Sequence, residues 1–159
     1  MVTAARQWFV DNLLDIDGID NVLQAARIPQ DEYAAKQIWG NRDNDNINCA
    51  FVFPKEIKPV NTVAGGNTFY WIDFEVQFFM SFKDSANVAG STQERFDLTV
   101  DNILTALGAG QLLSADKVHM LYPIEADGLM LLGDEGLINF LDKPVHAVKW
   151  TQKVKTRLT

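Results

Sequence analysis

Thiol and imidazole groups are scarce in this chain of 159 residues, which has one cysteine and two histidines. Cys49 has no second cysteine with which to form a disulfide bond or a thiolate metal cluster within one chain. His119 and His146 lie in strand-like stretches without a cysteine or histidine at metal-ligand spacing, so we expect structural roles on the surface or in a half-buried position. The sequence therefore predicts no metal, no cofactor and a reducing compartment.

Long apolar runs are also missing. No run approaches the roughly 20 residues that a membrane-spanning helix needs, and the N-terminus has neither a basic start nor an apolar signal core. A chain of this length with 47% apolar and 22% charged residues is typical of one globular domain. We therefore expect a single domain over residues 1–159 and no contact with a membrane.

Basic residues are few in the first 142 positions, which carry 9 of them against 21 acidic residues, a net charge of −12. Residues 143–159 carry 5 basic residues and no acidic one, a net charge of +5. Sequence-independent affinity for nucleic acid comes from lysine and arginine side chains that neutralise phosphates. The acidic body therefore argues against a protein that grips DNA or RNA.

The C-terminal cations alternate with apolar residues, which is typical of one face of a strand. They are Lys149, Lys153, Lys155 and Arg157. Two interpretations remain open. These cations either form a solvated strand face that pairs with acids such as Asp73 and Glu75 on a neighbouring strand or, less favoured, contact nucleic acid.

A second alternating stretch, from Phe69 to Phe82, predicts a strand of about 45 Å, far longer than usual. A helix is expected from Thr3, as its cap, to near Gly18. Another is expected from a Ser91–Glu94 capping box to Gly108 in the left-handed conformation. Its apolar face comprises Phe96, Val100, Ile103, Leu104 and Leu107.

Shorter elements complete the predicted order. A buried strand over 49–53 is stopped by Pro54, a strand covers 117–125, and a second long strand covers 145–158. Residues 129–144 are expected to be irregular, and residues 21–48 are ambiguous. The fold class is therefore predicted as α+β, an antiparallel β-sheet with long central strands packed on one face by two helices.

Candidate catalytic groups are sparse. Asp73 and Glu75 lie two apart on one strand face, about 7 Å between Cα atoms, which resembles the separation of a hydrolase carboxylate pair. Neighbouring carboxylates on a polar strand face are more often solubilising residues. No phosphate-binding loop and no nucleophile elbow is present. The sequence therefore predicts no enzyme.

Two aromatic residues lie on the polar side of the long strand. Trp71 and Phe79 alternate with Asp73, Glu75 and Gln77, on the side that water is expected to wet. Aromatic residues on a polar face indicate a subunit interface. The predicted interface residues are Trp71, Asp73, Glu75, Phe79, Lys149, Lys153, Lys155 and Arg157.

The order of elements resembles the tail-terminator proteins of long-tailed bacteriophages. The features that carry the resemblance are a short N-terminal helix, a strand ending in AFVFP, a long loop, a long strand ending in FFMSF, a helix and two more long strands. The resemblance covers residues 1–158 in outline, contains no diagnostic motif, and is weakest over residues 21–48.

This resemblance implies a structural protein of the virion, in the tail or neck. It implies a homohexameric ring that ends the tail tube, with the tail tube protein and the head–neck connector proteins as partners. DNA would pass through the lumen without specific binding, past a like-charged wall. Two alternatives stay open, a non-phage assembly module such as a component of a contractile injection device, and a small ligand-binding protein or enzyme.

Overall fold

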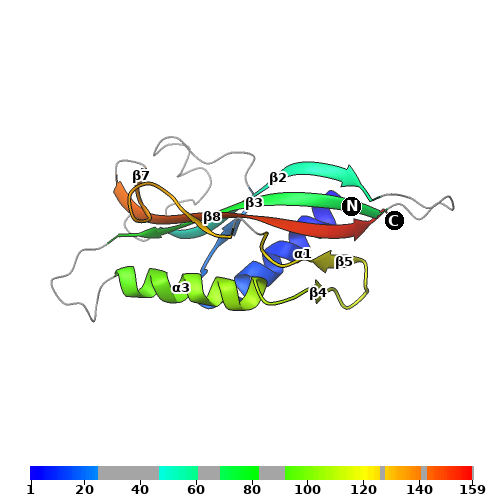
Figure 1. Ribbon diagram of the computed structural model, residues 1–159, viewed down its shortest axis with the longest axis horizontal. Helices are drawn as coiled ribbons and strands as arrows, with labels where there is room; N and C mark the ends of the chain where they lie inside the picture. Colours follow the sequence, from blue (N-terminus) through cyan, green and yellow to red (C-terminus); the bar gives the residue numbers. More distant parts are fainter. Residues whose placement is uncertain (25–46, 61–68, 83–91, 126–127, 141–142, 159) are drawn as a thin grey trace.

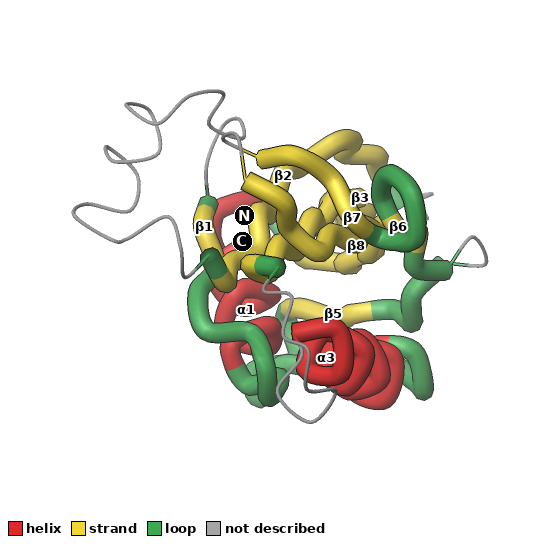
Figure 2. The backbone as a smooth tube through the Cα atoms, turned by 90° about the vertical axis from the view of Figure 1, so that its left-hand side faces the viewer, coloured by secondary structure: helices red, strands yellow, loops and turns green. Residues whose placement is uncertain are grey.

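A computed structural model describes residues 1–24, 47–60, 69–82, 92–125, 128–140 and 143–158. In these residues the fold is α+β, with a curled, mostly antiparallel sheet and two helices (Figures 1 and 2). The helices are α1 (Val2–Leu14) and α3 (Thr92–Leu107). Neither is long and apolar enough to cross a membrane.

The strands follow the order β1-β2-β3-β8-β5-β4 across the sheet, and β6 and β7 also pair with β8. Among these pairs, only β1 with β2 is parallel. The prediction that the two long strands lie at the centre is confirmed, because β3 pairs with β2 on one side and with β8 on the other. The strands are β1 (Val22–Leu23), β2 (Asn48–Pro59), β3 (Phe69–Ser81), β4 (Leu112–Leu113), β5 (His119–Leu121), β6 (Met130–Leu131), β7 (Leu137–Phe140) and β8 (Lys143–Arg157).

Both helices pack against the even-numbered residues of β3, on what we call the inner face of the sheet. Phe9 of α1 lies 5.6 Å from Phe74 between ring centroids, and Phe96 of α3 stacks on Phe78 at 6.4 Å. All four rings are buried. The alternation of apolar residues along β3 therefore builds the main core, as the sequence predicts.

The helix termini differ from the sequence prediction. Thr3 is not a cap, because α1 already begins at Val2. Gly108 is not left-handed, and its N–H makes an ordinary helical bond to the carbonyl of Leu104. Leu104 was expected inside but is 43% exposed. Thr99 is buried in its place, and the predicted cap Ser91 lies outside the described residues.

Three strand predictions are wrong. Pro54 does not stop β2, which continues to Pro59 through a bulge between Pro54 and Glu56. Proline is tolerated here because β1 pairs only with Ala50 and Phe51, so the described part of β2 beyond them is an edge. Residues 129–144 were expected to be irregular, but they contain β6, β7 and the start of β8, and the strand expected over 117–125 is reduced to β5. The first residues of the loop expected after Pro54 belong to β2. Residues 61–68 of that loop and residues 25–46 of the ambiguous stretch lie outside the described residues.

Candidate functional site on the outer sheet face

The outer face of the sheet, opposite the helices, is carried by the odd-numbered residues of β3 and β8. At the end of the sheet near the chain's C-terminus it presents two rows that cross four chain segments. One row contains Lys58, Trp71, Lys155 and Met120, and the next contains Glu56, Asp73, Lys153 and Tyr122. The prediction that Trp71 and Asp73 share this face with the C-terminal lysines is confirmed by the register.

Trp71 is half-buried at the centre of this surface. Tyr122 meets its ring edge-on, with 4.7 Å between centroids. The ammonium groups of Lys153 and Lys155 lie 5.7 and 5.6 Å from the Trp71 centroid, and Lys155 lies 4.9 Å from that of Phe69. Cations at these distances are attracted to the negative faces of aromatic rings. Trp71 is therefore partly covered by its own chain and partly open.

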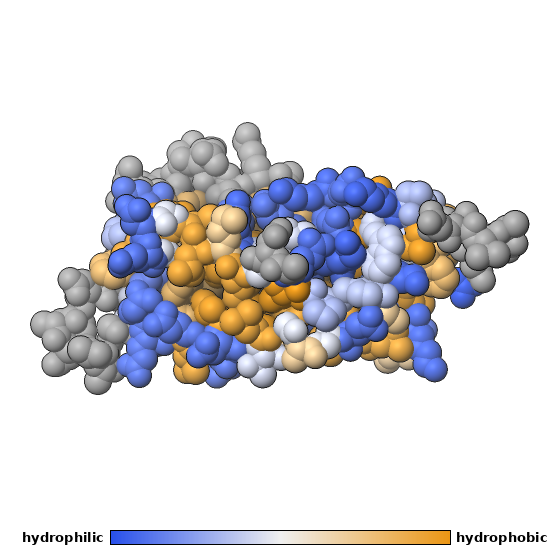
Figure 3. Space-filling view, viewed as in Figure 1, coloured by the Kyte–Doolittle hydropathy of each residue, from blue (hydrophilic) through white to orange (hydrophobic). Residues whose placement is uncertain are grey.

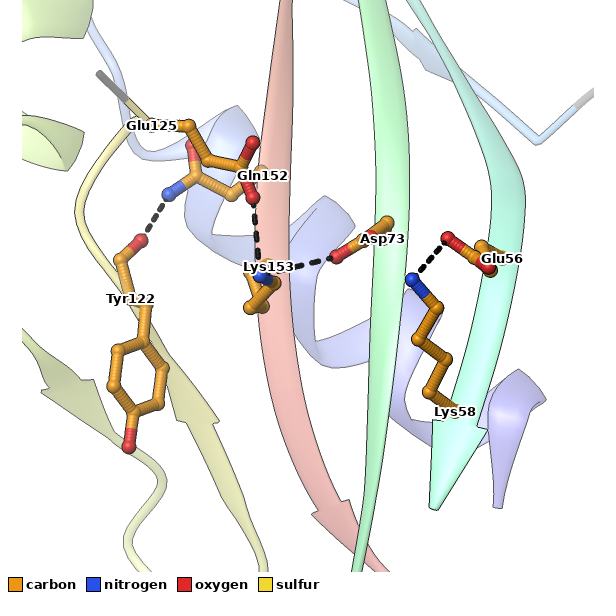
Figure 4. Close-up of polar contacts among 7 residues, drawn as sticks. All are labelled: Glu56, Lys58, Asp73, Tyr122, Glu125, Gln152 and Lys153. Carbon is orange, nitrogen blue, oxygen red and sulfur yellow. Dashed lines mark hydrogen bonds and ion pairs between the residues drawn. The ribbon is translucent and has the colours of Figure 1, made fainter. Parts of the chain in front are cut away.

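Asp73 is the least well satisfied carboxylate of this surface. Its Oδ1 atom is buried without a hydrogen bond, and Lys153 lies 4.0 Å away, beyond hydrogen-bond distance. Lys153 makes a closer ion pair with Glu125 at 3.2 Å, so one lysine is shared between two acids (Figure 4). Burial raises the pKa of Asp73, and the positive charge of Lys153 only partly offsets this.

The remaining acids of this face are paired with lysines. Glu75 lies 3.1 Å from Lys55, and Glu56 lies 2.8 Å from Lys58 (Figure 4). Each lysine is more than half exposed, so these pairs contribute little to stability. The solvated-face interpretation predicted C-terminal cations as partners of both acids, and this holds for Asp73 with Lys153 but not for Glu75, whose partner is Lys55 of β2.

Phe79 was expected on a wetted surface, and this is wrong. The residue is 2% exposed and stacks on Phe140 of β7 at 4.9 Å, with Phe51 at 5.5 Å. β7 reaches this position because it pairs with the beginning of β8. The resulting second apolar cluster on the outer face contains Ile47, Cys49, Phe51, Phe79, Phe140, Val145 and Ala147.

The other predicted interface residues lie on the outer side of β8. Lys149 is in register with Gln77, Lys153 with Asp73, Lys155 with Trp71 and Arg157 with Phe69. Sequence reasoning missed the contributions of Tyr122 and Glu125, which come from the segment after β5. Both residues lie in the strand predicted over 117–125, but the alignment of that stretch with β8 could not be read from the sequence.

Both histidines are buried inside the fold. His146 is fully buried, its Nε2 lies 2.9 Å from Thr92 Oγ1, and its ring stacks on Phe96 at 4.9 Å. His119 Nδ1 lies 2.8 Å from Thr156 Oγ1. Burial lowers the pKa of both imidazoles. Each has a structural role, although both are more deeply buried than the sequence suggested.

Two adjoining cavities of about 120 and 220 Å³ lie on a different side of the molecule, between α3, the end of β3 and the turn after α1. Asp20, Met80 and Arg95 line both of them. Sites for small molecules typically measure about 300–1,000 Å³, so each of these cavities is smaller than a typical site.

Within the described residues, no group of three or more His, Cys, Asp or Glu side chains is placed to hold a metal ion.

Comparison of the sequence with models of known protein families and with curated proteins finds no match. Function therefore has to be inferred from the residues of this chain.

Proposed function

We propose that this chain is a structural subunit of a long-tailed bacteriophage, one that forms a hexameric ring, ends the tail tube and joins it to the head–neck connector. The order of elements supports this proposal. It has the N-terminal helix α1, then β2, the long strand β3, the helix α3 and the C-terminal long strand β8, which are features of the resemblance described above. The fold alone does not select this role.

The observation that carries the proposal is the apolar surface that one copy leaves uncovered. Nine large apolar side chains of the described residues are between 37% and 57% exposed. Two pairs of them are neighbours in the sequence, Leu112 with Leu113 and Met130 with Leu131. Figure 3 shows apolar residues gathered between the β6–β7 region and α3. Contiguous apolar surface of this kind marks contact with another protein. The exposed residues are Leu14, Ile57, Leu98, Leu104, Leu112, Leu113, Met130, Leu131 and Leu158.

Copies of the chain meet through faces rather than through strand edges in this proposal. The described edge of β2 beyond Phe51 carries Pro54, Pro59, a bulge and two lysines, Lys55 and Lys58. Prolines, bulges and lysines on an edge strand oppose pairing with the edge of another sheet. Phe79 is buried within the subunit, so it is not part of the proposed interface, whereas Trp71 remains part of it.

Light scattering and electron microscopy of the purified protein test the ring. We expect a mass that is a multiple of 17.8 kDa and particles with a central hole. A monomer at every concentration contradicts the proposal. Purified phage tail tubes then test the role, since a terminator binds one end of each tube. Rings that do not bind tail tubes favour a non-phage assembly module instead.

A further inference from the structure

The two helices and β8 carry opposite charge. Residues 1–24 and 92–107, which contain both helices, have seven carboxylates against two arginines, Arg6 and Arg95. Residues 143–158, which contain β8, have five cations and no carboxylate, whereas the neighbouring strands of the outer face add Glu56, Asp73 and Glu75. The helices are therefore acidic and β8 is basic. The acidic residues are Asp11, Asp15, Asp17, Asp20, Glu94, Asp97 and Asp101.

On α3 the exposed acids form a line along the helix. Glu94, Asp97, Asp101 and Leu104 are three or four residues apart, so they point to the same side, away from the sheet. All four are exposed, Leu104 by 43%. We call these four residues the α3 stripe. Its two central carboxylates, on Asp97 and Asp101, are separated by about 6 Å along the helix axis.

On the outer face, Lys155 and Arg157 have a matching spacing. They are two residues apart on β8, which places them about 7 Å apart on the same side of the strand. Lys153 already pairs with Glu125, whereas Lys155 forms no ion pair with a described residue and lies against Trp71 and Phe69. This face therefore offers two neighbouring cations beside half-buried aromatic rings.

The apolar parts of the two surfaces also correspond. Leu104 lies about one helical turn beyond Asp101, and Trp71 lies beside Lys155 on the neighbouring strand. Trp71 lies to the side of the line from Arg157 to Lys155, so the helix offers two acids next to a leucine and the sheet offers two cations next to a tryptophan. Aromatic residues flanked by charges are typical of the centre of protein interfaces.

We propose that the α3 stripe of one copy packs on the Trp71–Lys155–Arg157 surface of the next copy. This inference rests on the proposed ring. Because two different surfaces meet, the contact is head-to-tail, and repeating it with a closing rotation generates a ring.

Charge reversal tests the pairing in four proteins. The helix variant is Asp97→Lys with Asp101→Lys, the sheet variant is Lys155→Glu with Arg157→Glu, and the combined variant carries all four changes. The control variant, Asp11→Lys with Asp15→Lys, makes the same charge change on α1. All changed residues are exposed or half-exposed, and circular dichroism checks that each variant is folded.

We expect the helix variant and the sheet variant each to lose the ring, since lysines then face cations or acids face acids. An equimolar mixture of the two should regain rings with alternating copies, and the combined variant should regain them alone. The control variant should keep its rings. Raising the ionic strength to about 1 M, where the Debye length is about 3 Å, should weaken the wild-type ring.

Two results overturn the inference. Rings that persist in the helix and sheet variants show that other surfaces meet, while the ring itself stands. Loss of the ring in both variants without recovery in the mixture or the combined variant shows that these residues do not face each other. A wild-type protein that never forms rings instead overturns the proposed function.

Discussion

The two ends of β3 have the same alternating pattern but different surroundings. At its N-terminal end, Trp71 and Asp73 face outward, and Tyr122 and the lysines of β8 cover them partly. At its C-terminal end, Phe79 faces outward on the same side and is sealed by Phe140 of β7. The outward direction of a side chain therefore follows from the strand period, whereas its exposure depends on which distant segment covers it.

The largest expected effect comes from removing the sealed aromatic ring. Phe79→Ala should lower the free energy of unfolding by about 3–5 kcal/mol, because it leaves a cavity between Phe51 and Phe140. Urea denaturation of dilute protein, followed by tryptophan fluorescence, measures this.

Trp71→Ala is the matched substitution at the open end. Since Trp71 is only partly buried, whereas Phe79 is 2% exposed, we expect a smaller loss than for Phe79→Ala in the separate subunit. It should also weaken the ring, which light scattering at decreasing concentration measures. Equal losses for the two substitutions would show that the two ends do not differ in burial.

A smaller effect is expected at the turn that lets β7 cover Phe79. Gly133 has a φ of +64°, and a Cβ atom there would lie 2.2 Å from the carbonyl oxygen of Leu137. Gly133→Ala should therefore lower the free energy of unfolding by on the order of 2 kcal/mol. Gly110→Ala is the control, because nothing lies within 4 Å of its Cβ position. A neutral Gly133→Ala would show that this turn does not hold β7 in place.

The contrast between the two ends also marks how far the sequence could predict the structure. Strand period and helix spacing give β3, β8, both helices and most of the main core, because these patterns depend on residues close together in the chain. They do not give β6 and β7, since each is too short to show a period and the segment between them contains Gly133 and Gly136. The burial of Phe79 depends on these strands, so it could not be read from the pattern around Phe79.

The same limit applies to the site. The alternation of Lys149, Lys153 and Lys155 predicts one charged strand face, and the register of β3 with β8 confirms it. Whether Lys153 pairs with Asp73 or with Glu125 depends on the path of the chain after β5. That path is set by tertiary contacts such as the bond from the Gln152 amide to the carbonyl of Tyr122 (Figure 4), which no local pattern encodes.

A pH-dependent change of about 1 kcal/mol in the free energy of unfolding is expected from His146, which is buried on the inner face of the sheet. Burial lowers its pKa in the folded state, so below about pH 6.5 the unfolded chain binds a proton that the folded chain does not. The stability is full above that pH and falls as the pH drops, with a slope of at most about 1.4 kcal/mol per pH unit.

Urea denaturation between pH 7 and pH 5 measures this slope, with His146→Gln as the comparison. The variant should be less stable at pH 7 but should lose less stability on acidification than the wild type. His119, whose pKa is also lowered by burial, remains in both proteins and contributes equally. Parallel pH profiles would contradict the assignment to His146.

The smallest effect is expected at the open end, from Asp73. Burial raises the pKa of Asp73, so the folded state favours the protonated carboxyl. The contribution of this group to the free energy of unfolding is therefore full below about pH 3.8, and it is lost as the pH rises through the folded-state pKa. Asp73→Asn removes that loss and should raise the free energy of unfolding at pH 7 by less than about 1 kcal/mol, because the side chain is partly exposed. Glu75→Gln is the control, since it breaks an ion pair with Lys55 and should leave stability unchanged or slightly lower. If Asp73→Asn destabilises the dilute subunit instead, the attraction between Lys153 and the Asp73 carboxylate outweighs the cost of burying that carboxylate. The ionised Asp73 would then stabilise the N-terminal end of β3.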